Sequence, residues 1–217
     1  MAYIVGVMLY MVRRVFMIVT ELQPMDNKKV RVYIDSEYAF PLYRSEIRKF
    51  GLAVNNDISP DKYEELRDVL FKRIRERILY IISDYDRPKK AIRQKLLDAG
   101  YPDEIVDEAI RHSEEYHYID DRRYACNLAE SLANNRHAGK RYIRNKLYEK
   151  GISATIIDEV LDEIEIDEAS QIESAIRKKG YHIEEIAELD DKEIGKLYAY
   201  LCRKGFSSSI IRNIIRK

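Results

Sequence analysis

The sequence predicts a mainly α-helical protein made of tandem three-helix modules, three repeats in a curved array, with a small N-terminal β-hairpin or sheet. Three observations predict this fold. An apolar pattern recurs about every 50 residues, each copy contains a glycine, and the patterning changes to period two near the N-terminus. The glycines of the three copies are Gly100, Gly151 and Gly205, which lie 51 and then 54 residues apart.

Each copy places apolar residues at i and i+4 before its glycine and at i, i+1, i+4 and i+5 after it. This spacing fits two amphipathic helices joined at a C-cap, where glycine adopts the left-handed conformation without a Cβ penalty. A helix of about ten residues is marginally stable alone, so each module must bury its apolar stripe against its own helices and its neighbours. In the second copy these residues are Ile143, Leu147, Ile156, Ile157, Val160 and Leu161.

The patterns divide the chain into four segments. The expected segments are an N-terminal β-hairpin with a short helix at 1–58 and three-helix repeats at 59–118, 119–166 and 167–217. Ser59 and the proline after it predict the start of a long helix in the first repeat. In the second repeat, the first helix is expected to turn at Asn134 and Asn135, ahead of Gly139.

The N-terminal segment has a different pattern. Between Val12 and Phe40 the residues alternate in short β-rich runs separated by turn residues, which predicts a hairpin or a three-stranded sheet. Arg13 and Arg14 interrupt the apolar opening, and the run before them is too short to span a bilayer. Because a signal peptide carries its basic residues before the apolar run, we expect residues 1–11 to be a tail and the protein to be cytoplasmic.

Composition limits the function classes only weakly. Lys+Arg and Asp+Glu both number 38, so the net charge of zero argues neither for nor against a nucleic-acid partner. Cys126 and Cys202 show no paired spacing and are expected to be free thiols.

The sequence carries little that indicates catalysis. It contains no GxxxxGK[ST] or GxGxxG phosphate loop, and its glycines are placed as helix stops. His112 and His117 are five residues apart, which puts them on different faces of a helix. We therefore expect no catalytic residue, no metal site and no cofactor.

Two adjacent carboxylates, Asp120 and Asp121, begin the second repeat. A metal or acid–base site would need further carboxylates nearby, and the sequence indicates none. An N-cap and an acidic first turn that complements the helix dipole is the favoured interpretation, alongside a role at a protein surface.

The strongest functional signal is charge segregation in the second repeat. One interpretation is a pair of solvated faces that neutralise each other, because the segment 158–168 that follows is strongly acidic. The other is a basic strip that binds an acidic partner or a phosphate backbone, extended by basic residues between Arg87 and Lys95. The basic strip consists of Arg136, Lys140, Arg141, Arg144, Lys146 and Lys150.

The second repeat also resembles a known family. The run from Tyr118 to Ala125, followed by Gly139-x3-Ile143-Arg144-x2-Leu147-x2-Lys150-Gly151-Ile152, resembles the RecX regulatory proteins, modulators of the bacterial RecA recombinase. Weaker matches lie around Gly100 and Gly205. The sequence departs from the family pattern at Lys146, where an acidic residue is expected, and at Pro88, where serine is usual.

The resemblance implies a non-enzymatic regulator that binds along the RecA–DNA filament and modulates, most often inhibits, RecA ATP hydrolysis, strand exchange and coprotease activity. It implies a place in DNA repair, DNA recombination and control of the SOS response, with single- or double-stranded DNA inside the filament as a candidate contact. A monomer without a membrane partner is expected. The resemblance carries a partner-binding role to Asp120, Asp121, Tyr124, Arg144 and Lys150. Together with Arg123 and the rest of the basic strip, these are the predicted partner-binding residues.

Two alternatives share the predicted fold. A stand-alone DNA-binding protein would place the helix between Lys140 and Lys150 on phosphates. Neutralising about four phosphates predicts a log–log salt slope near −3.6, and an affinity that falls roughly a hundredfold between 50 and 200 mM salt. A helical scaffold for another partner would differ only in what it binds.

Overall fold

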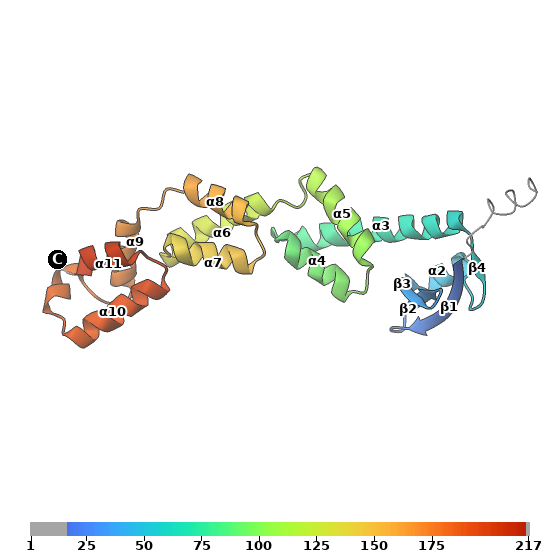
Figure 1. The fold of residues 1–217 in the computed structure, drawn as a ribbon, viewed down its shortest axis with the longest axis horizontal. Coiled ribbons are helices and arrows are strands. Elements are labelled where there is room, and N and C mark those ends of the chain that lie inside the picture. The colour runs from blue at the N-terminus through green and yellow to red at the C-terminus, as the bar shows by residue number, and fades with distance from the viewer. Residues whose placement is uncertain (1–16, 216–217) are drawn as a thin grey trace, which may run out of the picture. The chain divides into compact units, whose positions relative to one another are not determined.

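The computed structural model describes residues 17–215, which are mainly helical with one small antiparallel sheet (Figure 1). Backbone contacts divide the chain into two compact units. Unit 1 runs through Ile81 and includes Arg93–Tyr116, and unit 2 comprises Ile82–Ile92 and the chain from His117 onward. The strands are β1 (Met17–Pro24), β2 (Lys29–Ile34), β3 (Glu37–Tyr43) and β4 (Asp57–Ile58).

Helices make up most of both units. In unit 1 they begin with α2 (Arg44–Lys49) and α3 (Pro60–Ile82), and α4 (Lys89–Asp98) crosses the boundary before α5 (Asp103–Glu115). The helices of unit 2 are α6 (Asp121–Arg136), α7 (Lys140–Glu149), α8 (Ala154–Glu163), α9 (Glu168–Lys178), the 3-10 helix η1 (Ile183–Glu188), α10 (Asp191–Arg203) and α11 (Ser208–Ile215).

The sheet has the strand order β3-β2-β1-β4, with antiparallel neighbours. The side chains of Val30, Val32 and Ile34 are buried on one face of β2, as the alternating sequence predicts. The prediction of a hairpin or three-stranded sheet missed β4, because a two-residue strand is too short to show alternation. The tail expected at 1–11 lies outside the described residues.

Unit 1 packs the sheet and α2 against α3 and its neighbours. The face of α3 that carries Leu66, Leu70 and Ile74 is fully buried, following the predicted i+4 stripe. Arg73 on α3 forms a salt bridge with Glu46 on α2. The start of α3 is also as predicted. The side chain of Ser59 accepts a hydrogen bond from the backbone nitrogen of Lys62, three residues later.

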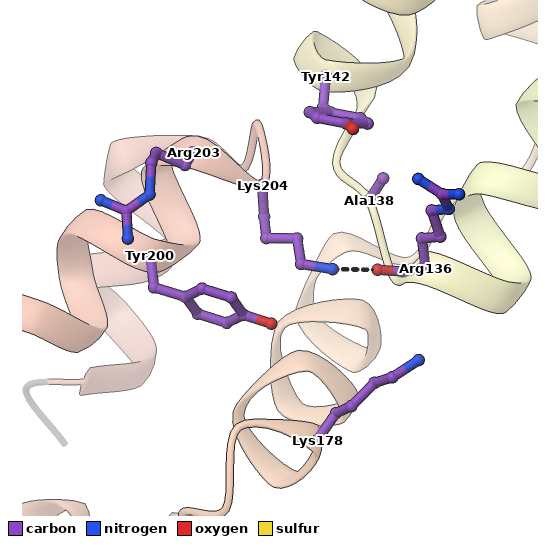
Figure 2. A pocket seen from close by; sticks show the side chains of 7 residues that line it. All are labelled: Arg136, Ala138, Tyr142, Lys178, Tyr200, Arg203 and Lys204. Carbon is purple, nitrogen blue, oxygen red and sulfur yellow. Dashed lines mark hydrogen bonds between the residues drawn. The ribbon is translucent and has the colours of Figure 1, made fainter.

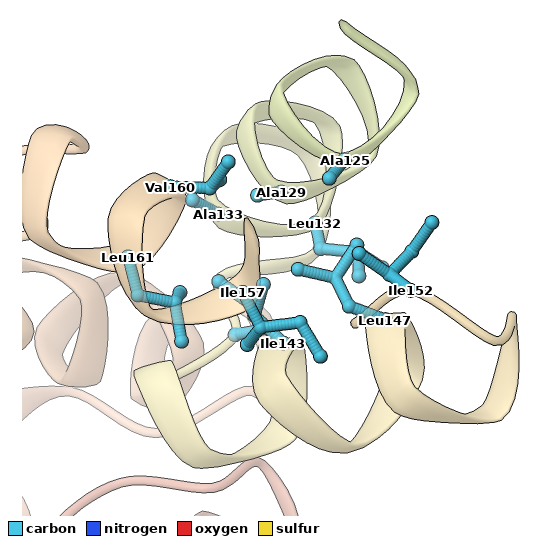
Figure 3. Close-up of a cluster of buried hydrophobic side chains, with 11 residues drawn as sticks. Ala125, Ala129, Leu132, Ala133, Ile143, Leu147, Ile152, Ile157, Val160 and Leu161 are labelled. Atoms are coloured by element: carbon cyan, nitrogen blue, oxygen red, sulfur yellow. The ribbon is translucent and has the colours of Figure 1, made fainter. Parts of the chain in front are cut away.

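The second repeat consists of α6, α7 and α8, whose predicted apolar stripes meet in one core (Figure 3). Small side chains on α6, such as Ala125 and Ala129, allow the three helices to approach closely. Ile143 and Leu147 of α7 point into the same core, facing Ile157 of α8. The i, i+4 pattern before Gly151 therefore identifies buried positions correctly.

The end of α6 differs from the prediction. The helix continues through Asn134 and Asn135 to Arg136, and it ends at His137, which adopts the left-handed conformation with φ 48°. The ring nitrogen Nδ1 of His137 lies 3.0 Å from Oε1 of Gln171 on α9. His137 therefore makes a contact between repeats from a backbone conformation that sequence pattern alone assigns to glycine or asparagine.

The third repeat adds η1 to the expected three helices. Its core brings Ile172 and Ala175 of α9 together with Leu197 of α10 and Ile211 of α11, and η1 adds Ile186. The sequence did not predict this 3-10 helix.

Candidate partner-binding surface

The acidic residues that begin the second repeat are helix caps. The carboxylate of Asp120 accepts a hydrogen bond of 2.8 Å from the backbone nitrogen of Arg123, which confirms the N-cap interpretation. Asp121 acts on another helix: its Oδ1 accepts a hydrogen bond of 2.7 Å from the backbone nitrogen of Lys89, the first residue of α4. Each carboxylate therefore satisfies a backbone donor that a helix start leaves without a partner.

The same arrangement recurs one repeat later. Asp167 caps α9 by accepting hydrogen bonds from the backbone nitrogens of Ala169 and Ser170. Glu168, the next residue, accepts a hydrogen bond of 3.3 Å from the backbone nitrogen of Lys140, the first residue of α7. In both places the first acidic residue caps its own helix, and the second caps the middle helix of the preceding repeat.

Arg123 and Tyr124 also have roles inside unit 2. Arg123 binds the carboxylate of Asp86 with two hydrogen bonds, 2.9 Å from Nε and 3.0 Å from Nη2, and this pairing raises the pKa of Arg123. Tyr124 is half-buried beside the second-repeat core, and burial raises its pKa. Both side chains hold the fold together, and a partner contact through them stays a prediction.

Half of the basic strip is engaged inside the second repeat. Arg144 is paired with Asp158 on α8, and Lys146 with Glu149 at 2.7 Å. Lys140 points its Nζ at the carbonyl oxygen of Leu161, 3.0 Å away at the end of α8. The interpretation of faces that neutralise each other therefore holds for Arg144 and the acidic segment after it.

The other three members of the strip are available for an external partner. Arg136, Arg141 and Lys150 are exposed, and between residues 17 and 215 no ion pair involves any of them. Arg141 lies in the first turn of α7, and Lys150 is the residue that ends this helix. The free positive charge is therefore smaller than the sequence suggests.

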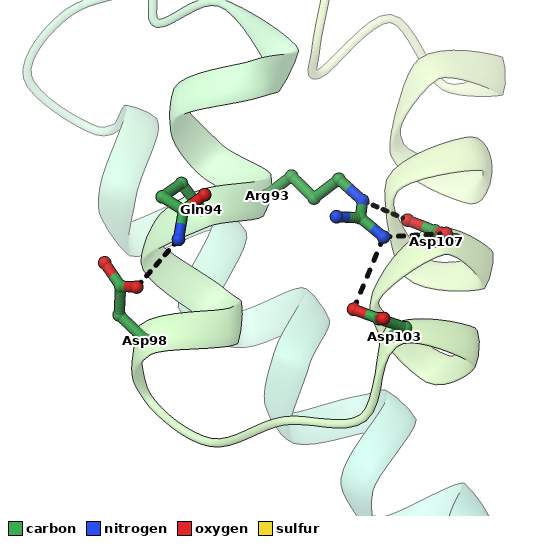
Figure 4. A network of polar contacts seen from close by, with 5 residues as sticks. All are labelled: Arg93, Gln94, Asp98, Asp103 and Asp107. Carbon is green, nitrogen blue, oxygen red and sulfur yellow. Dashed lines mark hydrogen bonds and ion pairs between the residues drawn. The ribbon is translucent and has the colours of Figure 1, made fainter.

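The predicted extension of the strip includes one residue that is neutralised. In unit 1, Arg93 donates a hydrogen bond of 2.7 Å from Nε to Asp107 and lies 3.4 Å from Asp103 (Figure 4). The bond to Asp107 raises the pKa of Arg93 and lowers that of the carboxyl group. Figure 4 also shows Gln94 bound to Asp98 on the same helix.

Sequence reasoning missed a basic and aromatic cavity in unit 2 (Figure 2). The cavity has a volume of about 300 Å³ and lies where the second and third repeats meet. Of the basic strip, only Arg136 lines it. No sequence window contains this group, because its members come from four separate helices and loops. The polar and aromatic side chains around it are those of Arg136, Tyr142, Lys178, Tyr200, Arg203 and Lys204.

A close backbone contact holds these two repeats together. The backbone nitrogen of Gly139 donates a hydrogen bond of 2.9 Å to the carbonyl oxygen of Lys204. A Cβ on Gly139 would lie 2.5 Å from the carbonyl oxygen of Gly205, and a Cβ on Gly205 would overlap the backbone nitrogen of Tyr142. Gly205 also has φ 84°, so both its conformation and its surroundings require glycine. We call this contact the second junction.

A related contact, which we call the first junction, joins the start of α4 to the second repeat. Here Gly151, with φ 85°, packs against the side chain of Lys90, and a Cβ on the glycine would lie 2.9 Å from the lysine Cβ. Asp121 caps α4 at the same place. The glycines that the sequence marks as helix stops therefore also form the contacts between repeats.

Known proteins share this architecture. Residues 120–161 match the family model described as "RecX, second three-helix domain". Residues 166–215 match the model described as "RecX, third three-helix domain". A relative from Clostridium beijerinckii, "Regulatory protein RecX", is 31% identical over 199 residues, which cover 91% of this chain and 92% of the relative. The chain belongs to the RecX family. A "Regulatory protein RecX" from Clostridium botulinum (strain Eklund 17B / Type B) is 29% identical over 91% of this chain and 93% of its own length.

Solved structures support the fold. "Crystal structure of regulatory protein RecX" has a TM-score of 0.63 at 22% identity, and the match covers 93% of this chain and all of that one. "Crystal structure of RecX from Lactobacillus salivarius" has a TM-score of 0.59 at 22% identity, over 67% of this chain and 94% of that one. These RecX structures confirm the predicted mainly helical architecture.

Metal sites and membrane-spanning helices are the other features to consider. Within residues 17–215, no three His, Cys, Asp or Glu side chains gather where they could hold a metal ion. Over the same residues, none of the helices combines the length and apolar character needed to cross a membrane. The two Clostridium relatives are both named as regulatory proteins.

Proposed function

We propose that this RecX-family chain is a non-enzymatic regulator that binds the RecA–DNA filament and lowers its ATP hydrolysis, strand exchange and coprotease activity. Family membership over more than nine-tenths of both chains carries the proposal, because the RecX resemblance implies RecA as partner. The action belongs to DNA repair, recombination and SOS control, in the cytoplasm and as a monomer.

The repeated helical modules support this proposal. A filament presents the same surface many times along its length. Tandem modules offer an extended surface that can contact several of these copies, whereas a single pocket could contact only one. The exposed side chains of Arg141 and Lys150, at opposite ends of α7, carry positive charge that is not neutralised inside the chain. Such charges increase the rate of encounter with an acidic protein surface or with DNA and help to select the partner.

The first test measures DNA-dependent ATP hydrolysis by RecA while the chain is added at less than equal stoichiometry. We expect the rate to fall at chain concentrations that do not bind the free DNA. An unchanged rate at saturating chain concentration contradicts the proposed function.

A pair of variants tests the role of the basic strip. R141E/K150E should weaken binding to the filament and leave the helical content unchanged, because both side chains are exposed and unpaired. The matched control is K192E/K196E, two exposed lysines on α10 outside the strip. Equal weakening in both variants would show that net charge, and not the strip, determines binding.

Direct binding to free DNA is the alternative function. The basic and aromatic lining of the cavity between the second and third repeats supports it. Tight binding to free DNA with a log–log salt slope near −3.6, without any effect on RecA, would support it.

A further inference from the structure

The cavity at the second junction carries an unusual concentration of positive charge. Arg136, Lys178, Arg203 and Lys204 line it, and no carboxylate is among its lining residues. Lys178 and Arg203 are exposed at its edge, and Figure 2 shows the side chain of Lys204 in the middle of the group. Lys178 donates a hydrogen bond from Nζ to the carbonyl oxygen of Asn135, 3.1 Å away. Four cations around one cavity, with no carboxylate among the residues that line it, favour the binding of an anion there.

Lys204, the central cation, is partly buried, and its charge is therefore incompletely solvated. Lys204 donates a hydrogen bond from Nζ to the carbonyl oxygen of Arg136. Burial lowers its pKa, and the charges of Lys178 and Arg136 lower it further. An anion in the cavity would replace the lost solvation and offset the repulsion among these side chains.

Two tyrosine rings form the apolar part of the cavity. Tyr142 comes from the first turn of α7 and Tyr200 from α10, so each repeat contributes one ring (Figure 2). Lysine ammonium groups already lie over these rings. Lys146 is 5.6 Å from the centre of the Tyr142 ring, and Lys179 and Lys204 are 5.5 Å and 5.7 Å from that of Tyr200. These distances are near the long limit for a cation–π contact, so a planar group replaces a lysine over a ring at small cost.

We propose that this cavity binds one nucleotide of a single-stranded nucleic acid. The base stacks on Tyr142 or Tyr200, and the flanking phosphates contact Lys178, Arg203 and Arg136. Single-strand binding sites combine a basic groove with aromatic rings in this way, and the stacking tolerates any base. The cavity is open to solvent, so the neighbouring nucleotides of the strand lie outside it.

The lining favours a nucleotide over an acidic peptide. A single carboxylate needs one or two cations and has no use for two aromatic walls, whereas a nucleotide presents a planar base together with a phosphate. The cavity volume of about 300 Å³ lies at the lower end of the range for small-ligand sites, which suits one bound unit.

Fluorescence anisotropy with a short labelled oligothymidylate tests the proposal on the full chain, with no recombinase present. K178E/R203E should weaken binding and reduce the magnitude of the log–log salt slope by about 1.4, because two phosphate contacts are lost. The matched control K192E/R212E reverses two exposed charges elsewhere in the third repeat and should keep the wild-type slope. Equal slopes in the two variants would overturn the proposal.

A second pair of variants isolates the stacking contact. Tyr200→Ala should weaken oligothymidylate binding roughly 5- to 150-fold, and Tyr200→Phe should keep it. Tyr198→Ala is the control, because Tyr198 packs against the same core outside the cavity. Equal loss in Tyr200→Ala and Tyr198→Ala would rule out stacking, and competition by oligoglutamate as strong as that by unlabelled oligothymidylate would show a carboxylate site instead.

This proposal does not depend on the RecA assay. A chain that binds the oligonucleotide through the cavity and leaves RecA unaffected would support the cavity and contradict the proposed function. A chain that inhibits RecA and whose cavity variants bind the oligonucleotide as wild type does would support the proposed function alone.

Discussion

The two junctions of unit 2 are built on one plan and differ in what they expose. At each junction a left-handed glycine packs against the start of the preceding middle helix, and a carboxylate from the next repeat caps that helix. Gly151 meets the side chain of Lys90, whereas Gly205 meets the backbone of Tyr142. The second junction is therefore the tighter and the less adaptable contact.

The two junctions also differ in the side chains five and two positions before each glycine. In the third repeat they are Tyr200 and Arg203, which line the cavity. In the second repeat they are Lys146 and Glu149, which form an ion pair with each other. One scaffold therefore carries an aromatic and a basic side chain beside the cavity at one junction, and an internal ion pair at the corresponding positions of the other.

The largest effect is expected when the tight junction is broken. Gly205→Ala should destabilise unit 2 by about 3–5 kcal/mol, because the new Cβ needs a left-handed backbone and overlaps the backbone of Tyr142. The control is Gly180→Ala, with φ 93° and no atom within 4 Å of the Cβ position, which should cost about 1–2 kcal/mol. Urea denaturation followed by circular dichroism measures both, and equal losses would contradict the close approach.

A smaller effect is expected at the first junction. Gly151→Ala should cost about 2–3 kcal/mol, and adding Lys90→Ala should recover about 1 kcal/mol, because the overlapping atoms beyond the lysine Cβ are removed. Tyr142→Ala should give no such recovery in Gly205→Ala, since the overlap there is with backbone. Denaturation of the two double variants shows whether the junctions differ in this way.

The caps should give still smaller effects. Asp121→Ala should cost about 1 kcal/mol and Glu168→Ala less, because the hydrogen bond to Lys89 is 2.7 Å and that to Lys140 is 3.3 Å. Amide hydrogen exchange should increase at Lys89 in the first variant and at Lys140 in the second. Faster exchange at both amides in either variant would mean that the two caps are not separate.

The smallest effect on stability is expected at the exposed ion pair. Glu149→Gln should leave the denaturation midpoint almost unchanged, since exposed pairs contribute little. The hydrogen bond to Glu149 raises the pKa of Lys146, so this pKa should fall in the variant. A titration of the lysine Nζ by NMR measures the change, and an unchanged pKa would show that the pair does not form in solution.

The sequence predicted the parts of the fold that depend on neighbours along the chain. Ile143 and Leu147 mark the buried face of α7 because helical periodicity requires it, and Gly151 and Gly205 adopt the expected left-handed conformation. The end of α6 was misplaced because His137 takes the left-handed position that sequence pattern assigns to glycine or asparagine, and its contact with Gln171, 34 residues away, is not visible along the chain.

The candidate site was less predictable, since its properties depend on distant partners. Asp121 and Lys89 are 32 residues apart, and nothing in either segment indicates that one caps the other. Charge counting gave the basic strip six members, but pairing of Arg144 across to α8 is visible only in the fold. Similarly, the cavity joins Arg136 to Lys204, which are 68 residues apart.

Each cap comes from one repeat and acts on the preceding one. These caps therefore impose an order on folding during synthesis. The first backbone nitrogen of α7 donates a hydrogen bond to Glu168, and the backbone nitrogen of Gly139 donates one to the carbonyl oxygen of Lys204. Both acceptors belong to a later part of the chain, which leaves the ribosome after the donors. Because chains are made from the N-terminus, the second repeat completes its hydrogen bonds only after the third has emerged. A nascent chain that stops after α8 therefore has an uncapped start of α7.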